Sequence, residues 1–581
     1  MCYPVYRDFG MRNRNSKEIL KLVEKRIKFA HVLIMVVFFA LILYLFLLQI
    51  FDIRHYKQKA INQRASKNFV MRGQIVDRNG LRLAVDKVSY DVSVHKLYLD
   101  YEPEELAEKI APILKMDKGN IASAINRGGI IVPLKKDVDR KTVAELKKLG
   151  LREICIDRKN ERVYPQDELA AHVIGYYNPN ADTASGIEFV AKKKLQSIEK
   201  SLSIQKTPRG DIIYETNTDP LLSATPQTGK TVTLTIDSAI QHVCERELLN
   251  MVTEKNARRG SVIVMNPKNG EILGYAVYPR YNPNNYKKTK AELLKNWTLT
   301  DVFPPGSTFK SLTVAAGLES GKITPTSKIL DTGKMKLGSW TITNYDYNKH
   351  PNPGMINLVY LLEHSSNVGS ANIAFKMTPA EFYNILSNLG IGKKTGIDLG
   401  GESTGLLPKP KRWDKATHGT MGYGYGASVT AMQMISAVSA LANEGVRVTP
   451  HVIKYSEEEE QQKVKRVQAI SPETAKTVTQ LLAKSVSNSK SVINLDKYSV
   501  AGKTGTSKKP KEKSKGYSDA VYTSVIGYLP ASNPQLLVYV IVDSPTGGAV
   551  WGNTVAGPIF KEVANQCARI LNIPPDKNVV K

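Results

Sequence analysis

The first clear feature of the hydrophobic pattern is one long apolar run. Residues 29–50 contain only His31 and Gln49 as strongly polar members. As a helix this run would extend about 33 Å, enough to cross a hydrocarbon core of about 30 Å. A cleavable signal peptide has a shorter apolar region and an Ala-x-Ala-like site, and this run has neither property. We therefore expect an uncleaved transmembrane anchor over residues 29–50, preceded by a basic tail at residues 1–28.

Beyond the anchor, the pattern changes to alternation. Apolar residues alternate from Arg72 into the dipeptide Asn79-Gly80, which is typical of a β-hairpin turn. Residues 100–150 show helical periodicity and many charges, which favours a solvent-exposed lobe. Together these stretches predict a mixed α+β domain over residues 51–228.

A second group of strands lies farther along the chain. Residues 232–237 lead into a helix that begins near Ser238, and residues 260–278 form a hairpin around Asn269-Gly270. Three more strands are expected at residues 499–506, 521–529 and 536–542. Between the two strand groups the segments are mostly helical or loops, and the acidic run Glu457–Glu460 is interpreted as a solvated loop. Strands at both ends with helices between them predict one antiparallel sheet with helices on its faces, over residues 229–581.

Candidate chemistry begins where a helix starts. Pro304, Pro305 and Gly306 precede a helix-compatible run from Ser307 to about Ser320, which ends at Gly321. Lys310 lies three residues after Ser307, on the same helix face. A serine beside an amine can perform acyl transfer, with the serine as nucleophile and the amine as its base. Alone, however, this spacing favours the interpretation of an ordinary helix start with an N-cap serine.

Two downstream motifs change that interpretation. They are Ser365-Ser366-Asn367 and Lys503-Thr504-Gly505-Thr506, which follow Ser307 and Lys310 in order. Together with Ser307 and Lys310, these two motifs resemble the active-site set of penicillin-binding proteins and serine β-lactamases.

The hairpin with Leu83-Ala84, just beyond the anchor, is similar to the opening of the pedestal (dimerisation) domain of class B penicillin-binding proteins. Other stretches fit the same domain: Arg162–Pro165, Ala171–Gly175 and Gly186–Glu188. We interpret His172 and Glu188 within them as structural residues.

The resemblance implies a fold and a set of roles. The fold is a single transmembrane helix, a mixed α+β pedestal, and an α/β penicilloyl-serine transferase domain with an antiparallel sheet covered by helices on both faces. Ser307 would be the nucleophile and Lys310 its neutral base. Ser365 would relay the proton to the leaving amine, and Asn367 would bind Lys310 and the substrate amide. Thr504 and Thr506 would bind a terminal carboxylate, Gly505 would let the substrate approach, and the N–H groups of Ser307 and Thr506 would form the oxyanion hole.

The two lysines need different charge states. Lowering the pKa of Lys310 from about 10.4 to about 7–8 requires roughly 4 kcal/mol of destabilisation of its cation. Burial supplies part of this, and a retained positive charge on Lys503 would supply more.

Within class B, the chain is most similar to the division-specific (septal) transpeptidase. The stretches that carry this likeness are Thr300–Phe303, Ser366–Gly369 and Gly424–Gly426 with Thr430 and Gln433. Two features depart from the family pattern. Trp551-Gly552-Asn553 replaces an aromatic residue followed by two glycines, and a lysine-rich loop follows the Lys-Thr-Gly motif at residues 508–515.

The composition limits the classes of partner that we expect the protein to bind. The net charge of +27 and the pI near 9.6 are compatible with an anionic membrane surface or cell-wall polymer, or with dispersed surface lysines. No zinc-finger, RNP-like or P-loop motif accompanies the charge, so nucleic acid is not expected as a partner.

None of the four cysteines (Cys2, Cys155, Cys244 and Cys567) has a metal or redox spacing. At most one disulfide could form outside the cell, and buried free thiols are the expectation. The resemblance implies no metal and no cofactor.

These observations predict a membrane-anchored D,D-transpeptidase. It would cross-link peptidoglycan stem peptides ending in D-Ala-D-Ala with a neighbouring amine, and β-lactams would inhibit it covalently. Expected partners are the membrane, a polytopic lipid II glycosyltransferase and other division-complex proteins. The body would lie outside the cytoplasmic membrane with the N-terminus inside, although basic residues on both sides of the anchor give little charge asymmetry. The alternatives are a lateral-wall transpeptidase of the same class and a non-catalytic penicillin sensor or scaffold.

Overall fold

The computed structural model describes most of the chain: residues 15–50, 71–179, 181–196, 205–206, 212–213, 229–338, 340–489, 491–511 and 516–577. It divides into two units, residues 1–69 with 199–226, and residues 70–198 with 227–581. Described residues of the first unit form helix α1 (Asn15–Ile50) and the strand pair β7 (Gln205–Lys206) and β8 (Ile212–Ile213).

Helix α1 contains the predicted anchor. Residues 21–46 are long and apolar enough to cross a membrane by length and composition, and their side chains are exposed. A long helix that is apolar on all sides has the character of a membrane span. The helix begins before residue 29, so part of the basic tail is helical as well.

The pedestal is built on one long strand. Strand β2 (Arg82–His95) pairs with β1 (Ile75–Val76), with β3 (Ile131–Val138) and with β4 (Ile154–Val163). The predicted hairpin turn is confirmed, since Gly80 has φ +90° and Ile75 pairs with Ala84. Strand β9 (Val232–Thr233) joins this sheet in parallel with β1.

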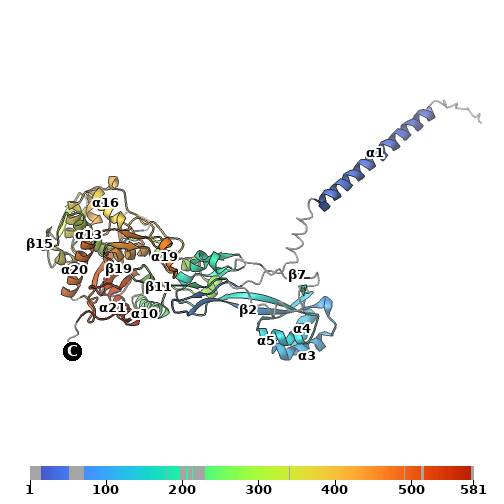
Figure 1. The fold of residues 1–581 in the computed structure, drawn as a ribbon, viewed down its shortest axis with the longest axis horizontal. Coiled ribbons are helices and arrows are strands. Elements are labelled where there is room, and N and C mark those ends of the chain that lie inside the picture. The colour runs from blue at the N-terminus through green and yellow to red at the C-terminus, as the bar shows by residue number, and fades with distance from the viewer. Residues whose placement is uncertain are drawn as a thin grey trace, which may run out of the picture. The chain divides into compact units, whose positions relative to one another are not determined.

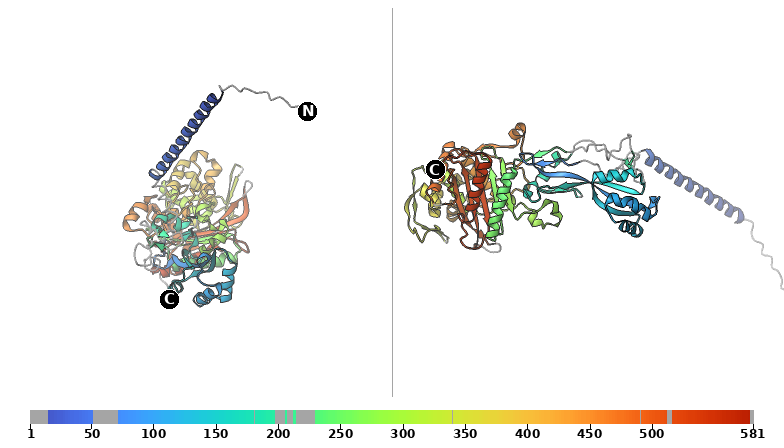
Figure 2. Two further views of the ribbon diagram at one scale, coloured as in Figure 1. Left: turned by 90° about the vertical axis from the view of Figure 1, so that its right-hand side faces the viewer. Right: turned by 90° about the horizontal axis from the view of Figure 1, so that it is seen from below.

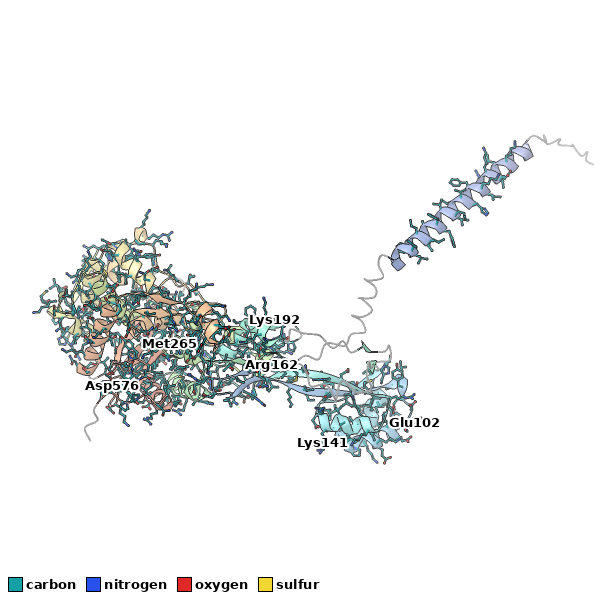
Figure 3. All side chains as sticks on the ribbon, viewed as in Figure 1. Glu102, Lys141, Arg162, Lys192, Met265 and Asp576 are labelled. Atoms are coloured by element: carbon teal, nitrogen blue, oxygen red, sulfur yellow. The ribbon has the colours of Figure 1, made fainter. Side chains whose placement is uncertain are left out.

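Helices cover one end of this sheet. Their apolar faces form a separate small core with the sheet, which includes Leu106, Ile110, Ile121 and Val143. The predicted helical lobe at residues 100–150 is therefore confirmed. In Figure 3, Glu102 and Lys141 lie in this lobe, and Arg162 lies toward the other end of β2. The short elements of the pedestal are η1 (Lys96–Tyr98), α3 (Pro103–Leu114), α4 (Lys118–Arg127), α5 (Arg140–Lys148), α6 (Ala171–Ile174), β5 (Tyr177–Asn178), β6 (Thr183–Ala184), α7 (Gly186–Val190) and α8 (Lys192–Leu195).

Glu188 links the pedestal stretches that the sequence singled out. Its buried carboxylate binds the guanidinium of Arg72 at 2.5 Å and that of Arg162 at 2.6 Å. Arg162 also contacts Asp86 at 3.1 Å, so two arginines face two carboxylates. The structural interpretation of Glu188 is confirmed, and so is that of His172, whose pKa burial lowers to about 4.

We expect Glu188→Ala to destabilise the protein by about 3–5 kcal/mol, because it leaves two buried guanidinium groups without their main anion. Glu161, one residue from Arg162 and exposed, gives the matched control. Glu161→Ala should change the unfolding free energy by no more than about 0.5 kcal/mol. Urea unfolding of both variants measures the difference, and equal midpoints would contradict this account of the network.

The part of the chain that follows the pedestal is built on a five-stranded antiparallel sheet, with the strand order β11-β10-β20-β19-β18. Its strands are β10 (Arg259–Met265), β11 (Ile272–Tyr278), β18 (Ala501–Pro510), β19 (Tyr517–Leu529) and β20 (Leu536–Asp543). Every neighbouring pair is antiparallel. All five strands were predicted from the sequence, and so was their union into one sheet.

Alternation along β20 divides the core between the two faces of the sheet. Val538, Val540 and Val542 pack with helices α10 (Ser238–Glu254) and α21 (Ala556–Ile570). Leu537, Tyr539 and Ile541 belong to the opposite core, with α13 (Lys310–Glu319), α18 (Ala431–Leu441) and α20 (Pro472–Asn488). Successive strand residues point to opposite faces, so a strand covered on both sides is apolar throughout. Figures 1 and 2 show helices on both sides of the sheet.

Besides α13, α18 and α20, further segments lie between β11 and β18 in the chain. They are η2 (Pro283–Lys288), α11 (Ala291–Leu294), α12 (Trp297–Thr300), η3 (Gly306–Phe309), β12 (Lys328–Asp331), β13 (Lys334–Leu337), β14 (Trp340–Thr343), β15 (Gly354–Asn357), α14 (Leu358–Glu363), α15 (Asn367–Lys376), α16 (Pro379–Asn388), η4 (Pro410–Arg412), α17 (Lys415–Met421), β16 (Val446–Val448), α19 (Glu457–Lys463) and β17 (Arg466–Gln468).

Two expectations were wrong. The acidic run Glu457–Glu460 is not a loop but the first turns of α19. Ser456 and Glu459 form a capping box there, and acidic side chains suit a helix N-terminus. The lysine-rich stretch is also less of a loop than expected, because β18 continues to Pro510 and pairs with β19 from Tyr517. Lys513 and Lys515 lie outside the described residues.

Among the described cysteines, Cys244 and Cys567 are free thiols and fully buried. The expectation of buried free thiols is therefore confirmed for Cys244 and Cys567. Cys2 lies outside the described residues.

Candidate active site

Ser307 lies on a tight turn at the start of a buried helix. Gly306 has φ +59° and opens the 3-10 turn η3, which contains Ser307; α13 then begins at Lys310. The expected helix start at Ser307 is thus a 3-10 turn, a common form for the first turn of a helix. The Lys310 Nζ lies 3.1 Å from the Ser307 Oγ. A half-buried hydroxyl therefore faces a buried amine at hydrogen-bond distance.

The amine of Lys310 is surrounded by oxygen atoms of the second motif. Its Nζ lies 3.0 Å from the Ser365 Oγ, 2.5 Å from the Ser365 carbonyl oxygen and 2.7 Å from the Asn367 Oδ1. Burial, and then the charge of Lys503, lower the pKa of Lys310 well below its ordinary value, against smaller opposing effects of Asp331 and Asp346. A lysine with a lowered pKa can accept a proton near neutral pH.

The second motif is held by a network of hydrogen bonds. Ser366 caps α15: its Oγ accepts from the Gly369 N–H at 2.8 Å and donates to Asp331 at 2.5 Å. Asn344 Oδ1 accepts from the backbone N–H of Asn367 at 2.8 Å. Asn367 Nδ2 in turn donates to the Thr343 carbonyl at 2.8 Å. These contacts fix the Asn367 amide with its oxygen toward Lys310.

The third motif lies on β18, at the edge of the sheet, as the sequence predicted. Lys503 is buried, and this burial lowers its pKa to about 8, so it carries a proton at neutral pH. Thr504 and Thr506 are half-buried, and the Thr506 Oγ1 accepts from the Gly552 N–H at 3.0 Å. Gly552, from the stretch that departs from the family pattern, therefore positions the hydroxyl of Thr506.

Gly505 has a role that spacing did not reveal. A Cβ added there would lie 2.7 Å from the Ser524 Oγ, 3.0 Å from the Thr308 Cγ2 and 3.3 Å from the Thr308 nitrogen. The glycine therefore allows β18 to pack directly against the turn that carries Ser307, besides any contact with substrate.

We expect Gly505→Ala to slow acylation by about 10–100-fold, because the added methyl group separates β18 from η3 and small misplacements of catalytic groups are costly. A stopped-flow penicillin acylation rate would measure this. Gly129→Ala is the control, since a Cβ at Gly129 meets open space. An unchanged rate in Gly505→Ala would show that the close packing is unimportant for the reaction.

Sequence motifs missed two residues of this arrangement, Asp331 and Asn344. Both are buried, and Asn344 Nδ2 donates to both carboxylate oxygens of Asp331 at 2.9 Å. Asp331 directly precedes Thr332-Gly333 and Asn344 directly follows a short strand, so local sequence marks both only as turn residues. Their function becomes visible only when the fold brings them beneath Ser366 and Asn367.

The rim of the site also differs from expectation. Lys508 donates its backbone N–H to the Tyr425 Oη at 2.8 Å. Lys509 forms an ion pair with the buried Asp543 at 2.5 Å, and Asp543 also binds Arg259 at 2.7 Å. Two of the lysines that were interpreted as a loop are therefore strand residues with fixed partners.

Comparison with known proteins agrees with this arrangement. A family model described as the penicillin binding protein transpeptidase domain matches residues 260–565, more than half of the chain. The chain belongs to this family. A second model, the penicillin-binding protein dimerisation domain, matches residues 67–234. The predicted resemblance to class B penicillin-binding proteins is confirmed.

Individual relatives span most of this penicillin-binding protein. It is 29% identical to the probable peptidoglycan D,D-transpeptidase PbpC of Pseudomonas aeruginosa, over 87% of this chain and 88% of the relative. It is also 29% identical to the peptidoglycan D,D-transpeptidase FtsI of Escherichia coli, over 87% of this chain and 84% of the relative. The crystal structure of penicillin binding protein 2X from Streptococcus thermophilus shares the fold, with a TM-score of 0.73 at 22% identity, covering 86% of this chain and 79% of that one.

Proposed function

We propose that this penicillin-binding protein is a serine D,D-transpeptidase that cross-links peptidoglycan stem peptides through an acyl-enzyme on Ser307. The observation that carries the proposal is the contact of the buried Lys310 amine with both Ser307 and the Ser365-Ser366-Asn367 motif. The relatives named as D,D-transpeptidases support the same reaction.

In the acylation step, neutral Lys310 takes the proton of Ser307. The Ser307 Oγ then attacks the carbonyl carbon of the penultimate D-Ala, and an ester bond replaces the peptide bond to the last D-Ala. Ser365 passes the proton from Lys310 to the departing amine, which leaves as free D-Ala. The backbone N–H groups of Ser307 and Thr506 stabilise the oxyanion, at about 3–4 kcal/mol per donor.

In the second step the direction of proton transfer is reversed. The amine of a neighbouring stem attacks the ester carbonyl, a new peptide bond forms, and Ser307 recovers its proton. Before acylation, Asn367 binds the donor amide, while Thr504, Thr506 and the protonated Lys503 bind the terminal carboxylate of the last D-Ala. A β-lactam imitates the donor: its ring opens on Ser307, but the leaving amine stays attached, so the ester persists. Side chains and backbone N–H groups of this protein perform each of these steps.

The division of the chain follows from this role. We assign residues 1–28 to a cytoplasmic tail, 29–50 to the anchor, 51–228 to the pedestal and 229–581 to the transpeptidase domain. Among the described residues, α1 is the one helix long and apolar enough to cross a membrane, which supports a single-pass anchor in the cytoplasmic membrane, with the catalytic body on the outer side, where the stem peptides lie.

A septal role is the finer part of the proposal, together with a polytopic lipid II glycosyltransferase and other division-complex proteins as partners. It is supported by the division-type stretches near the site, of which Thr430 and Gln433 form a capping box on α18. A fluorescent fusion should concentrate at midcell in dividing cells. Uniform sidewall fluorescence would instead support a role in lateral-wall growth.

Turnover tests the reaction itself. The purified full-length protein should release free D-Ala from a donor stem peptide and form a cross-linked dimer when an amine-bearing acceptor stem is supplied. A sensor would release about one D-Ala per protein molecule and stop. Burst release without further product would therefore overturn the transpeptidase proposal in favour of a penicillin-binding receptor.

A further inference from the structure

Close to the active site lies a cluster of side chains that the reaction does not use. Asp346, His350 and His364 each offer a ligand atom, and these atoms all lie within 4.8 Å of one another. The Asp346 Oδ2 and the His364 Nδ1 are 3.3 Å apart. The rings of His350 and His364 are 5.5 Å apart and nearly perpendicular, at 85°. Two imidazoles and a carboxylate thus converge on one point.

Local structure brings these three groups together. After β14 the chain makes a helical turn in which Lys349 and His350 donate their backbone N–H groups to the Asp346 carbonyl, at 2.8 and 2.9 Å. Residues four apart in such a turn lie on the same side. His364 follows α14 and stacks on Tyr360 at 4.0 Å between ring centroids, which fixes its orientation.

The donor set has the chemistry of a zinc site. Zinc binds imidazole nitrogen and carboxylate oxygen at about 2.0–2.2 Å, and sites with three protein ligands keep a fourth position for water or another ligand. Tetrahedral geometry at those bond lengths places the donor atoms about 3.4 Å apart. Asp346 and His364 already have this spacing, and a ring nitrogen of the exposed His350 lies within 4.8 Å of both.

We propose that Asp346, His350 and His364 form a binding site for a divalent transition-metal ion, with zinc as the best chemical match. Calcium and magnesium are disfavoured because they prefer oxygen ligands. Cysteine spacing gave no indication of this site, since its ligands are histidines and an aspartate.

The position of the site indicates its role. His364 directly precedes Ser365, whose backbone has φ +51°, a conformation unusual for serine. Asp346 lies two residues after Asn344, which holds the backbone of Asn367. A metal ion at this site would therefore tie together the two segments that place Ser365 and Asn367. Its ligands act as positioning residues, not as groups that touch the substrate.

Metal binding can be tested without any catalysis. The full-length protein, stripped by a chelator, should take up one Co²⁺ per chain with the intense visible absorption of four-coordinate cobalt, and Zn²⁺ should displace it. His350→Ala should weaken Zn²⁺ binding by at least about 100-fold, since even the loss of an outer partner costs 10–100-fold. His242→Ala is the matched control, because His242 is exposed on α10 and outside the cluster; it should bind like the wild type.

A second readout tests the positioning role. Removal of zinc should slow penicillin acylation of the wild type and leave the rate of His350→Ala unchanged. Because His350 is exposed, its replacement should keep the wild-type circular dichroism spectrum. Equal cobalt uptake by the wild type and His350→Ala, or uptake without the four-coordinate spectrum, would overturn the metal site. A bound ion whose removal leaves the wild-type acylation rate unchanged would overturn the positioning role. The uptake readout needs no acyl transfer, so failure of the proposed transpeptidase function would leave it intact.

Discussion

Ser307→Ala will abolish covalent labelling of this protein by a fluorescent penicillin. The variant lacks the proposed nucleophile, the hydroxyl that lies 3.1 Å from the Lys310 amine. Loss of a serine nucleophile from a comparable catalytic unit lowers the rate by on the order of 10⁴–10⁶-fold, which would leave no visible band after electrophoresis.

The matched control is Ser320→Ala, at the far end of the same helical segment. The Ser320 hydroxyl donates only to the Gly317 carbonyl at 3.1 Å, so labelling should equal that of the wild type. Both variants should unfold at about the wild-type temperature, because neither hydroxyl supports the core. Retained labelling in Ser307→Ala would remove this serine from the role of nucleophile.

The second large effect is expected at Lys310. Lys310→Arg keeps a positive charge at this position, but arginine stays protonated in proteins and cannot accept the proton of Ser307. Acylation by penicillin should fall by at least about 10³-fold, as for the loss of a general base. Stopped-flow acylation rates measure this, and a near wild-type rate would disprove the assignment of the base.

Lys503 should affect the same reaction through pH. Its positive charge lowers the pKa of Lys310. Lys503→Ala removes this charge, so the pKa of Lys310 rises and the acylation rate should increase only at higher pH than in the wild type. Lys503→Arg keeps a cation and should retain part of the activity. An alkaline-going limb at the same pH in Lys503→Ala and wild type would refute the electrostatic coupling, while leaving the reaction itself unchallenged.

The sequence was most informative where residue patterns are local. The strands β10, β11, β19 and β20 are apolar runs bounded by turn signals, so their existence and even their common sheet could be predicted. The three motifs could be read in the same way, because each is a short segment whose backbone geometry follows from its own residues. From the sequence, only the family resemblance implied that the motifs meet at one point. In the structure, the contacts of Lys310 with Ser307, Ser365 and Asn367 bring the first two motifs together.

Long-range contacts could not be predicted. Asp331 and Asn344 have ordinary turn surroundings in the sequence, and their buried contacts with Ser366 and Asn367 depend on the fold. The same is true of Gly505, whose neighbour Thr308 is almost 200 residues away in the chain. The acidic run at α19 differs from the predicted loop for a local reason: Ser456 and Glu459 form a capping box that starts a helix there.

The most direct test of the central claim is to locate the acyl group. The full-length protein is mixed with a donor stem peptide, quenched in acid within the first turnover, digested and analysed by tandem mass spectrometry. We predict one ester adduct on the peptide that contains Ser307, with the mass of the stem lacking its last D-Ala, and its disappearance when the acceptor amine is added before the quench. An adduct on a different residue, or cross-linked product formed with no adduct on Ser307, would contradict the account.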